Sequence, residues 1–324
     1  MAALSDQRQT PLIDLRERQP AYLASLLAEE ASEWSHLDWD FEPSADLVRR
    51  FMGMKALCGF ALPAGGAAYS NTAAGYAYYV SDEGKGLIGG LYVSRAYRTE
   101  ENENALIEAV LESLWRIPGI RRVEAQLVML ESPLNRSIPY TQYLRSHARK
   151  FLEAPLGKVA ELPPRHPAVT IAPWAENRQS DAGRLIAAAY SGHIDSEIND
   201  QYRSPGGARR FLANIVQYPG CGSFFGSASF VAIPQGGQGL CGLSLASIVS
   251  EGVGHITQVC VAPSHRDTGL GYELLRRSLV ALAAHGCRKV TLTVTASNTG
   301  AIQLYERLGF TNRRDFAAYV WEAR

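Results

Sequence analysis

The two halves of this chain repeat one another, and this repeat is the feature that most limits how the chain can fold. Residues 91–107, LYVSRAYRTEENENALI, align without a gap with residues 259–275, VCVAPSHRDTGLGYELL. The offset is 168 residues (266 − 98), so Arg98 falls on Arg266 and Val93 on Val261. Each copy has a strand-like stretch, a turn and a helix-like stretch in the same order. A repeat of this length indicates a duplicated domain rather than a solenoid unit.

A proline-rich segment, residues 161–174, separates the two halves. Proline favours an extended connector over a helix here. We therefore predict a first domain over residues 1–160, a linker over 161–167 and a second domain over 168–324. A chain of 324 residues is long enough for two domains.

Hydrophobic periodicity gives each half an order of helices and strands. In the second half, two helices follow a first strand, and three strands separated by glycine-rich turns come next. A helix is expected from about Tyr272 to His285, with Leu275, Leu279 and Leu282 on one face. A strand, a short helix and a closing strand complete the half. The first half shows two strands, a helix and a strand in the matching order, so a mixed α+β fold is indicated.

Composition excludes several classes of partner. The chain has 32 basic and 32 acidic side chains, which gives no overall electrostatic attraction to nucleic acid or to an anionic membrane. No apolar run approaches the roughly 20 residues of a membrane-spanning helix, and the N-terminus lacks the layout of a signal peptide. The five cysteines are scattered without a CxxC pair, so neither disulfides nor a metal site is indicated. A cytoplasmic protein is expected.

The turn between Pro263 and Tyr272 has the composition of an anion-binding loop. Two glycines, Gly269 and Gly271, stand where the helix begins, although glycine lowers helix stability. Without Cβ atoms there, a phosphate can reach the unpaired N–H groups of a helix N-terminus. Arg266 adds a cation at the entrance. The alternative is a tight turn that only needs flexible residues, and the turn alone does not decide between the two.

The surroundings of this turn resemble the GNAT superfamily of acyl-CoA-dependent N-acetyltransferases. The resemblance rests on the strand QVCVAP, the RxxGxG turn, Asn298 after the next strand and the closing LYERLGF. It implies tandem GNAT folds, each a mostly antiparallel twisted sheet flanked by helices, with acetyl-CoA bound between two separating strands of the second. The implied cofactor-binding residues are Val259, Cys260, Val261, Arg266, Asp267, Thr268, Gly269, Leu270, Gly271, Tyr272 and Asn298. Asn298 also suits a helix N-cap, and the two roles are compatible.

The same resemblance suggests the groups that move protons. Tyr305 lies where the family places a tyrosine beside the cofactor sulfur, and a phenol can protonate a departing thiolate. The alternative for Tyr305 is a packed aromatic with a satisfied hydroxyl. His255 lies eleven residues before Arg266, where some members carry a basic glutamate, and is the candidate base. A hydrogen-bonded structural histidine, with water taking the proton, is the alternative.

The first copy of the turn has lost its glycines. Glu101 and Glu103 replace Gly269 and Gly271, and two carboxylates would repel a pyrophosphate. The first domain is therefore expected to be degenerate, without the usual acetyl-CoA site.

The function expected is transfer of an acetyl group from acetyl-CoA to a primary amine of a small molecule, by direct attack in a ternary complex. Asp195 and Glu197 lie between the first two helices of the second half and are expected to bind the amine. A polar surface loop is the alternative reading of that segment. Two other functions remain open, a non-catalytic acyl-CoA sensor and a mycothiol-synthase-like acetyltransferase suggested by the two-domain layout.

Overall fold

The structure, a computed structural model, describes residues 11–66, 70–82, 84–218 and 220–322. Its contacts divide the chain into two compact units. Within the described residues, unit 1 holds 11–34, 44–146 and 317–322, and unit 2 holds 35–43 and 147–316. Neither unit is one continuous stretch of chain. The domain boundaries at 160 and 168 concern the duplicated sequence and stay a prediction.

Unit 1 is built on a sheet with the strand order β1-β2-β3-β4-β5-β13. Its strands are β1 (Ile13–Asp14), β2 (Gly59–Pro63), β3 (Ala73–Asp82), β4 (Lys85–Val93), β5 (Arg122–Leu127) and the end of β13 (Thr311–Glu322). All neighbours are antiparallel except β4 and β5. The final strand therefore comes from the C-terminal end of the chain, where Ala317–Glu322 pairs with β5.

Helices cover both faces of this sheet. The helices are α1 (Ala24–Ser35), α2 (Glu42–Gly53) and α3 (Glu100–Trp115). α3 buries Leu106, Val110 and Leu114 against alternate residues of β3, β4 and β5, as the periodicity predicted. On the opposite face, Glu30 of α1 accepts a hydrogen bond of 2.7 Å from the Tyr76 hydroxyl of β3. The sequence analysis did not predict α1 or α2.

Unit 2 has the strand order β6-β12-β11-β10-β9-β7, with Thr311–Phe316 of β13 beside β6. The strands are β6 (Leu144–Pro155), β7 (Val169–Pro173), β8 (Ser223–Phe224), β9 (Phe230–Pro234), β10 (Gly242–Ser250), β11 (Val253–Val261) and β12 (Lys289–Thr295), with β8 pairing β10. Among the paired strands here only β11 and β12 are parallel. Both units are thus mostly antiparallel, and the predicted α+β class is confirmed.

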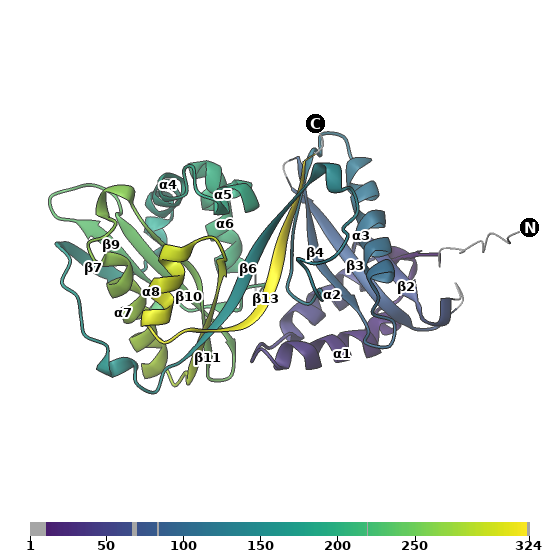
Figure 1. Cartoon of the computed structure of the whole chain (residues 1–324), viewed down its shortest axis with the longest axis horizontal. Coiled ribbons are helices and arrows are strands. Elements are labelled where there is room, and N and C mark those ends of the chain that lie inside the picture. Colours follow the sequence, from purple (N-terminus) through teal and green to yellow (C-terminus); the bar gives the residue numbers. More distant parts are fainter. Residues whose placement is uncertain (1–10, 67–69, 83, 219, 323–324) are drawn as a thin grey trace, which may run out of the picture. The chain divides into compact units, whose positions relative to one another are not determined.

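Two layers of helices enclose the sheet of unit 2 (Figure 1). The helices are α4 (Gln179–Ala189), α5 (Asp195–Ile198), α6 (Pro205–Gln217), α7 (Leu270–Ala284) and α8 (Thr299–Arg307). α7 and α8 pack with Ile256 and Leu292 on one face, while α4 and α6 pack with Leu245 and Cys260 on the other. Gly286, in the left-handed region at φ 100°, follows His285, the C-cap residue of α7. No helix among the described residues combines the length and the apolar character needed to cross a bilayer.

Trp321 shows how strongly the last strand is tied into unit 1. Its side chain is fully buried, and its indole N–H donates to the carbonyl of Pro139 at 2.9 Å. The hydroxyl of the neighbouring Tyr319 likewise donates to Pro133 O at 2.5 Å. Because both rings are sealed inside the unit, a C-terminal segment is part of its core.

We predict that Trp321→Ala lowers the free energy of unfolding by about 3–5 kcal/mol, since the change leaves a large cavity and an unpaired carbonyl. Urea unfolding followed by circular dichroism measures this loss. Met54→Ala, at a side chain 55% exposed in the same unit, is the control and should change stability by less than about 0.5 kcal/mol. Equal effects of the two substitutions would contradict the prediction.

Candidate functional site

The two parallel strands of unit 2 separate part-way along their length. β11 and β12 are paired over Val253–Ile256 and Lys289–Leu292. The register between β10 and β11 shifts at Thr257, which is the extra residue of a β-bulge, and a bulge bends its strand. In the described part of the sheet the parallel pairing ends there, although the strands continue to Val261 and Thr295.

This separation leaves backbone groups of β11 without a strand partner. The N–H of Ala262 donates to the carbonyl of Cys241, the residue before β10, at 2.9 Å. The alternate residues Val259 and Val261 therefore direct their N–H and C=O groups to the opposite edge. The Tyr190 hydroxyl donates to Val259 O at 3.3 Å from that side. An extended ligand with amide groups can bind such an edge as an added strand.

The start of α7 lies directly beyond this edge. The first helical hydrogen bond joins Glu273 N–H to Gly269 O at 3.1 Å. The N–H groups of Leu270, Gly271 and Tyr272 therefore precede the ladder and have no intrahelical acceptor. Gly269 holds φ at 80°, a conformation that side chains disfavour. Three adjacent N–H donors at a positive helix end form an anion site.

Gly271 leaves open space at the same helix end. A Cβ atom added there would lie 3.6 Å from Val261 Cγ2 and 3.7 Å from Leu304 Cδ2. A methyl group therefore fits, but a longer side chain would extend into the space over the N–H groups. This geometry fits a pyrophosphate group close to the backbone.

The remaining predicted residues of this turn define its shape. Arg266 donates to Ala189 O at 2.7 Å, which ties the turn to the end of α4. Asp267 is exposed at φ 61°, and the Thr268 hydroxyl donates to His265 O at 2.7 Å. Leu270 is buried, so of its groups only the backbone N–H is available.

Asn298 begins α8, as one of its two predicted roles requires. Its side-chain oxygen accepts from Ala301 N–H at 3.3 Å, and its amide nitrogen lies 3.4 Å from His193 Nε2. Asn298 is therefore an N-cap residue that also faces the loop before α5.

A polar cluster lies at the end of β12. The Thr295 hydroxyl donates to Asp195 Oδ1. Arg149 of β6 lies 3.9 Å from the same oxygen, and His193 Nδ1 lies 3.6 Å from Asp195 Oδ2. Arg149 also donates to the Thr293 hydroxyl at 3.2 Å. Carboxylate, guanidinium and imidazole therefore meet where the parallel strands have separated.

Tyr305 of α8 is buried close to this cluster. Burial raises the pKa of its hydroxyl, the charge of Asp195 raises it further, and Arg149 opposes the shift. The phenol is therefore protonated at neutral pH and can act only as a donor. It packs against Phe310, with ring centroids 5.8 Å apart.

Two stacked tyrosines border the gap between the separated ends of β11 and β12, on the side of α4 and α6. Tyr190 and Tyr202 have ring centroids 4.6 Å apart. Gln258 of β11 joins them, donating to the Tyr190 hydroxyl at 2.9 Å and accepting from the Tyr202 hydroxyl at 3.3 Å. These rings give the site an aromatic wall with hydroxyl groups in it.

His255 is not placed with this cluster. Its ring is 5% exposed and lies against Trp39 and Phe151, and its Nδ1 is 2.8 Å from the Thr291 hydroxyl. Burial lowers the pKa of the imidazole to about 3. An imidazole sealed from solvent that resists protonation is poorly suited to be a general base, so this placement argues against the predicted role.

Glu197 and Cys260, two other residues predicted for the site, lie in very different surroundings. Glu197 is exposed on α5, whereas Asp195 of the same helix lies in the polar cluster. Burial raises the pKa of the Cys260 thiol to about 12, which leaves it protonated and unsuited to covalent catalysis.

Unit 1 contains the same strand separation but a different turn. β4 and β5 are paired only over Lys85–Ile88 and Arg122–Ala125. A register shift at Gly89 corresponds to Thr257 at the 168-residue offset. The duplicated sequence thus builds the same gap twice.

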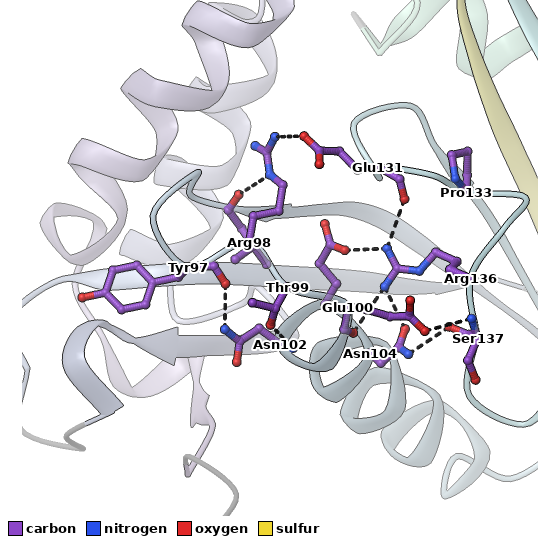
Figure 2. Close-up of polar contacts among 12 residues, drawn as sticks. Tyr97, Arg98, Thr99, Glu100, Asn102, Asn104, Glu131, Pro133, Arg136 and Ser137 are labelled. Atoms are coloured by element: carbon purple, nitrogen blue, oxygen red, sulfur yellow. Dashed lines mark hydrogen bonds and ion pairs between the residues drawn. The ribbon is translucent and has the colours of Figure 1, made fainter.

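The helix start beside this second gap is filled by the chain itself (Figure 2). Glu103, which aligns with Gly271, pairs with Arg136, and both side chains are under 5% exposed. Arg136 also donates to Asn104 Oδ1 at 3.1 Å and to Glu100 O at 3.3 Å. Ser137 N–H donates to the Glu100 carboxylate at 2.8 Å. The segment 131–137 therefore covers the start of α3 through these contacts.

Arg98, which aligns with Arg266, makes different contacts in unit 1. Arg98 donates to Val93 O at 3.1 Å and to Glu131 Oε1 at 2.9 Å (Figure 2). It thus holds the same segment, and is not left facing a ligand.

Sequence reasoning missed several residues of the unit 2 cluster. Arg149 precedes the predicted linker, so it was not considered with the second domain, and nothing in its local sequence marks it. Thr293 and Thr295 were seen only as part of an alternating strand. His193 and Tyr190 lie between α4 and α5, and nothing in their local sequence pairs them with Asp195 or Gln258.

Comparison with known proteins agrees with this geometry. Residues 175–310 match the model of the acetyltransferase (GNAT) family. A GCN5-related N-acetyltransferase from Sphaerobacter thermophilus has a TM-score of 0.64 at 20% identity, covering 97% of this chain and 96% of that one. A tandem GNAT protein from the clavulanic acid biosynthesis pathway has a TM-score of 0.54 at 17% identity, covering 83% of each chain. These likenesses show the fold.

Curated relatives match over shorter segments. A mycothiol acetyltransferase of Actinosynnema mirum is 29% identical over 166 residues, 51% of this chain and 52% of the relative. An N-alpha-acetyltransferase of Arabidopsis thaliana, MAK3, is 38% identical over 66 residues, 20% of this chain and 35% of the relative. The chain spans about half the length, or less, of these relatives.

The region that matches the acetyltransferase (GNAT) family lies in the C-terminal half of the chain, and it contains the separated parallel strands and the glycines at the start of α7. Enzymes of this family use acyl-CoA and acetylate amines.

The burial of His255 predicts a pH dependence of stability. The unfolded chain binds a proton on this residue below about pH 6.5, while the folded chain does not until about pH 3. The free energy of unfolding therefore falls as the pH is lowered through this window, by up to about 1.4 kcal/mol per pH unit from this residue.

We expect His255→Gln to make the fall between pH 6 and pH 4.5 shallower, as measured by urea unfolding at a series of pH values. His36→Gln, at an exposed position of the same unit, serves as the control and should keep the slope of the parent protein. An unchanged slope in His255→Gln would show that the folded protein protonates this residue as readily as the unfolded chain.

Proposed function

We propose that this chain transfers the acetyl group of acetyl-CoA to the primary amine of a small molecule, and that unit 2 alone carries the reaction. The observation that carries the proposal is the free edge of β11 at Val259 and Val261, followed directly by the N–H groups without an intrahelical acceptor at the start of α7, with Tyr305 buried near Asp195. Each part matches one part of the cofactor: the amide-containing arm, the pyrophosphate and the thioester. Bound there, acetyl-CoA supplies the activated acetyl group.

The residues of unit 2 supply binding and proton donation. The N–H groups of Leu270, Gly271 and Tyr272 hold the pyrophosphate, and Val259 and Val261 align the arm. The Asp195 carboxylate holds the incoming amine near the thioester.

Tyr305 completes the reaction as the acid. The amine nitrogen forms a bond to the acetyl carbon, the C–S bond breaks, and Tyr305 donates its proton to the departing sulfur. The proton that the new amide nitrogen loses restores the phenol. The ammonium proton must leave before attack, and the buried position of His255 supports water as its acceptor. His255→Gln is accordingly expected to keep the transfer rate.

A mycothiol-acetyltransferase-like role is a second candidate. It is supported by the 29% identity to the relative from Actinosynnema mirum over 166 residues. That match reaches only about half of each chain, so the broader function is the one proposed.

The anion site at the start of α7 predicts that each chain binds one molecule of coenzyme A. Isothermal titration calorimetry measures this stoichiometry. Gly271→Glu should weaken coenzyme A binding at least about tenfold, because it introduces the side chain found at Glu103 and repels the pyrophosphate. Gly206→Glu, in the exposed first turn of α6, is the matched control and should bind as the parent does. Two molecules per chain, or unimpaired binding by Gly271→Glu, would refute the site.

Tyr305→Phe tests catalysis separately from binding. We predict that kcat for acetyl transfer falls by about 100-fold or more, while the affinity for coenzyme A is kept. Tyr218→Phe, at a ring 58% exposed, should leave both unchanged. The assay follows release of coenzyme A with a panel of primary amines. Tight binding of acetyl-CoA by the parent protein without any turnover would favour an acyl-CoA sensor instead.

A further inference from the structure

The Arg149 guanidinium lies in the site of unit 2 with most of its hydrogen-bonding capacity unused. Its side chain is 11% exposed. It donates to the Thr293 hydroxyl at 3.2 Å and stacks over Phe316, 5.8 Å from the ring centroid. Among the described residues its buried Nε has no hydrogen-bond partner. A guanidinium has five N–H donors, so a charged and largely buried group is left far from satisfied.

The nearest anion does not satisfy it. Asp195 Oδ1 is 3.9 Å from Arg149 Nη1, which is beyond hydrogen-bond distance. That oxygen already accepts from the Thr295 hydroxyl. Buried polar groups in folded proteins are nearly always paired, so the unused donors call for acceptor oxygens, and the described residues provide none for Nε.

The position of Arg149 determines what those oxygens belong to. Arg149 lies opposite Thr295 on the neighbouring strand, at the end of β12 where the parallel strands have separated. The charge of Arg149 lowers the pKa of the Tyr305 and Tyr202 hydroxyls, and the charge of Asp195 raises it, so both charged groups lie near these two rings. A cationic and an anionic side chain therefore stand side by side at the place where the acceptor amine must lie.

We propose that the acceptor carries an anionic oxygen group, a carboxylate or a phosphate, in addition to its amine, and that Arg149 binds this group while Asp195 holds the amine. This inference rests on the proposed function for the position of the acceptor, and it narrows the substrate class to amino acids and phosphorylated amines. The planar fork of arginine suits both anions, because it can offer two parallel N–H donors.

Matched pairs of amines that differ only in the anion test the proposal. One pair is L-alanine and L-alaninamide, and the other is glucosamine 6-phosphate and glucosamine. Dissociation constants are measured calorimetrically on the full chain saturated with coenzyme A, so the readout does not depend on turnover. We expect the anionic member of at least one pair to bind about tenfold or more tightly, and the preferred pair identifies the anion.

Variants then assign the preference to Arg149. Arg149→Gln should bring the ratio of dissociation constants within the preferred pair close to one, and Arg149→Lys should give an intermediate ratio, because it keeps the charge and loses the fork. Lys150→Gln is the control, since Lys150 is the next residue of β6 and pairs with Asp315. It should keep the ratio of the parent protein.

Two results would overturn the proposal. One is equal binding of both members in both pairs, or no binding of any of the four amines, by the parent protein. The other is a ratio that Arg149→Gln does not change, which would make Arg149 only a support for Asp195. Failure of the proposed function looks different, because the anionic amine would then bind with the Arg149-dependent preference and not be acetylated.

Discussion

The site depends on one interruption of the sheet, the bulge at Thr257. Up to Ile256, β11 and β12 satisfy each other's backbone groups, and beyond it the edge of β11 pairs with no strand in the part of the chain that the structure describes. An unpaired edge inside a folded unit is costly unless a ligand, water or side chain takes its hydrogen bonds. The Tyr190 hydroxyl takes one of them. The same defect that weakens the sheet therefore creates a binding surface.

The two units show that the gap alone does not define a site. Both have the bulge and the short parallel pairing, but their helix starts differ. In unit 2 glycine leaves the N–H groups of α7 accessible, whereas in unit 1 the paired side chains of Glu103 and Arg136 fill that space. At the position where unit 2 has Gly271, unit 1 has Glu103 in a buried ion pair with Arg136 of the loop before β6.

Local patterns in the sequence predicted what is locally determined. Strands β7, β9, β10, β11 and β12, the extent of α7 and the N-cap at Asn298 follow from periodicity, glycine positions and capping chemistry, and the structure confirms them, whereas β6 and β8 were not predicted. The burial of His255 could not be predicted, because it depends on a contact with Trp39, more than two hundred residues earlier in the chain. Asp195 and Glu197 looked alike in sequence, and only the fold places one in the cluster and the other in solvent.

Arg149 was missed for a reason that concerns the whole chain. β6 precedes the predicted linker, but its residues 149–155 pair with β12 in unit 2, and the end of β13 pairs with β5 in unit 1. Each half of the sequence thus gives a strand to the unit that the other half mainly builds. A chain cut at residues 161–167 would leave β12 without its neighbour and the cluster around Asp195 without its guanidinium. The duplication therefore produced two units whose sheets are complete only when both halves are present, and the first half, although its own cradle is filled, supplies a charged group of the proposed acceptor site.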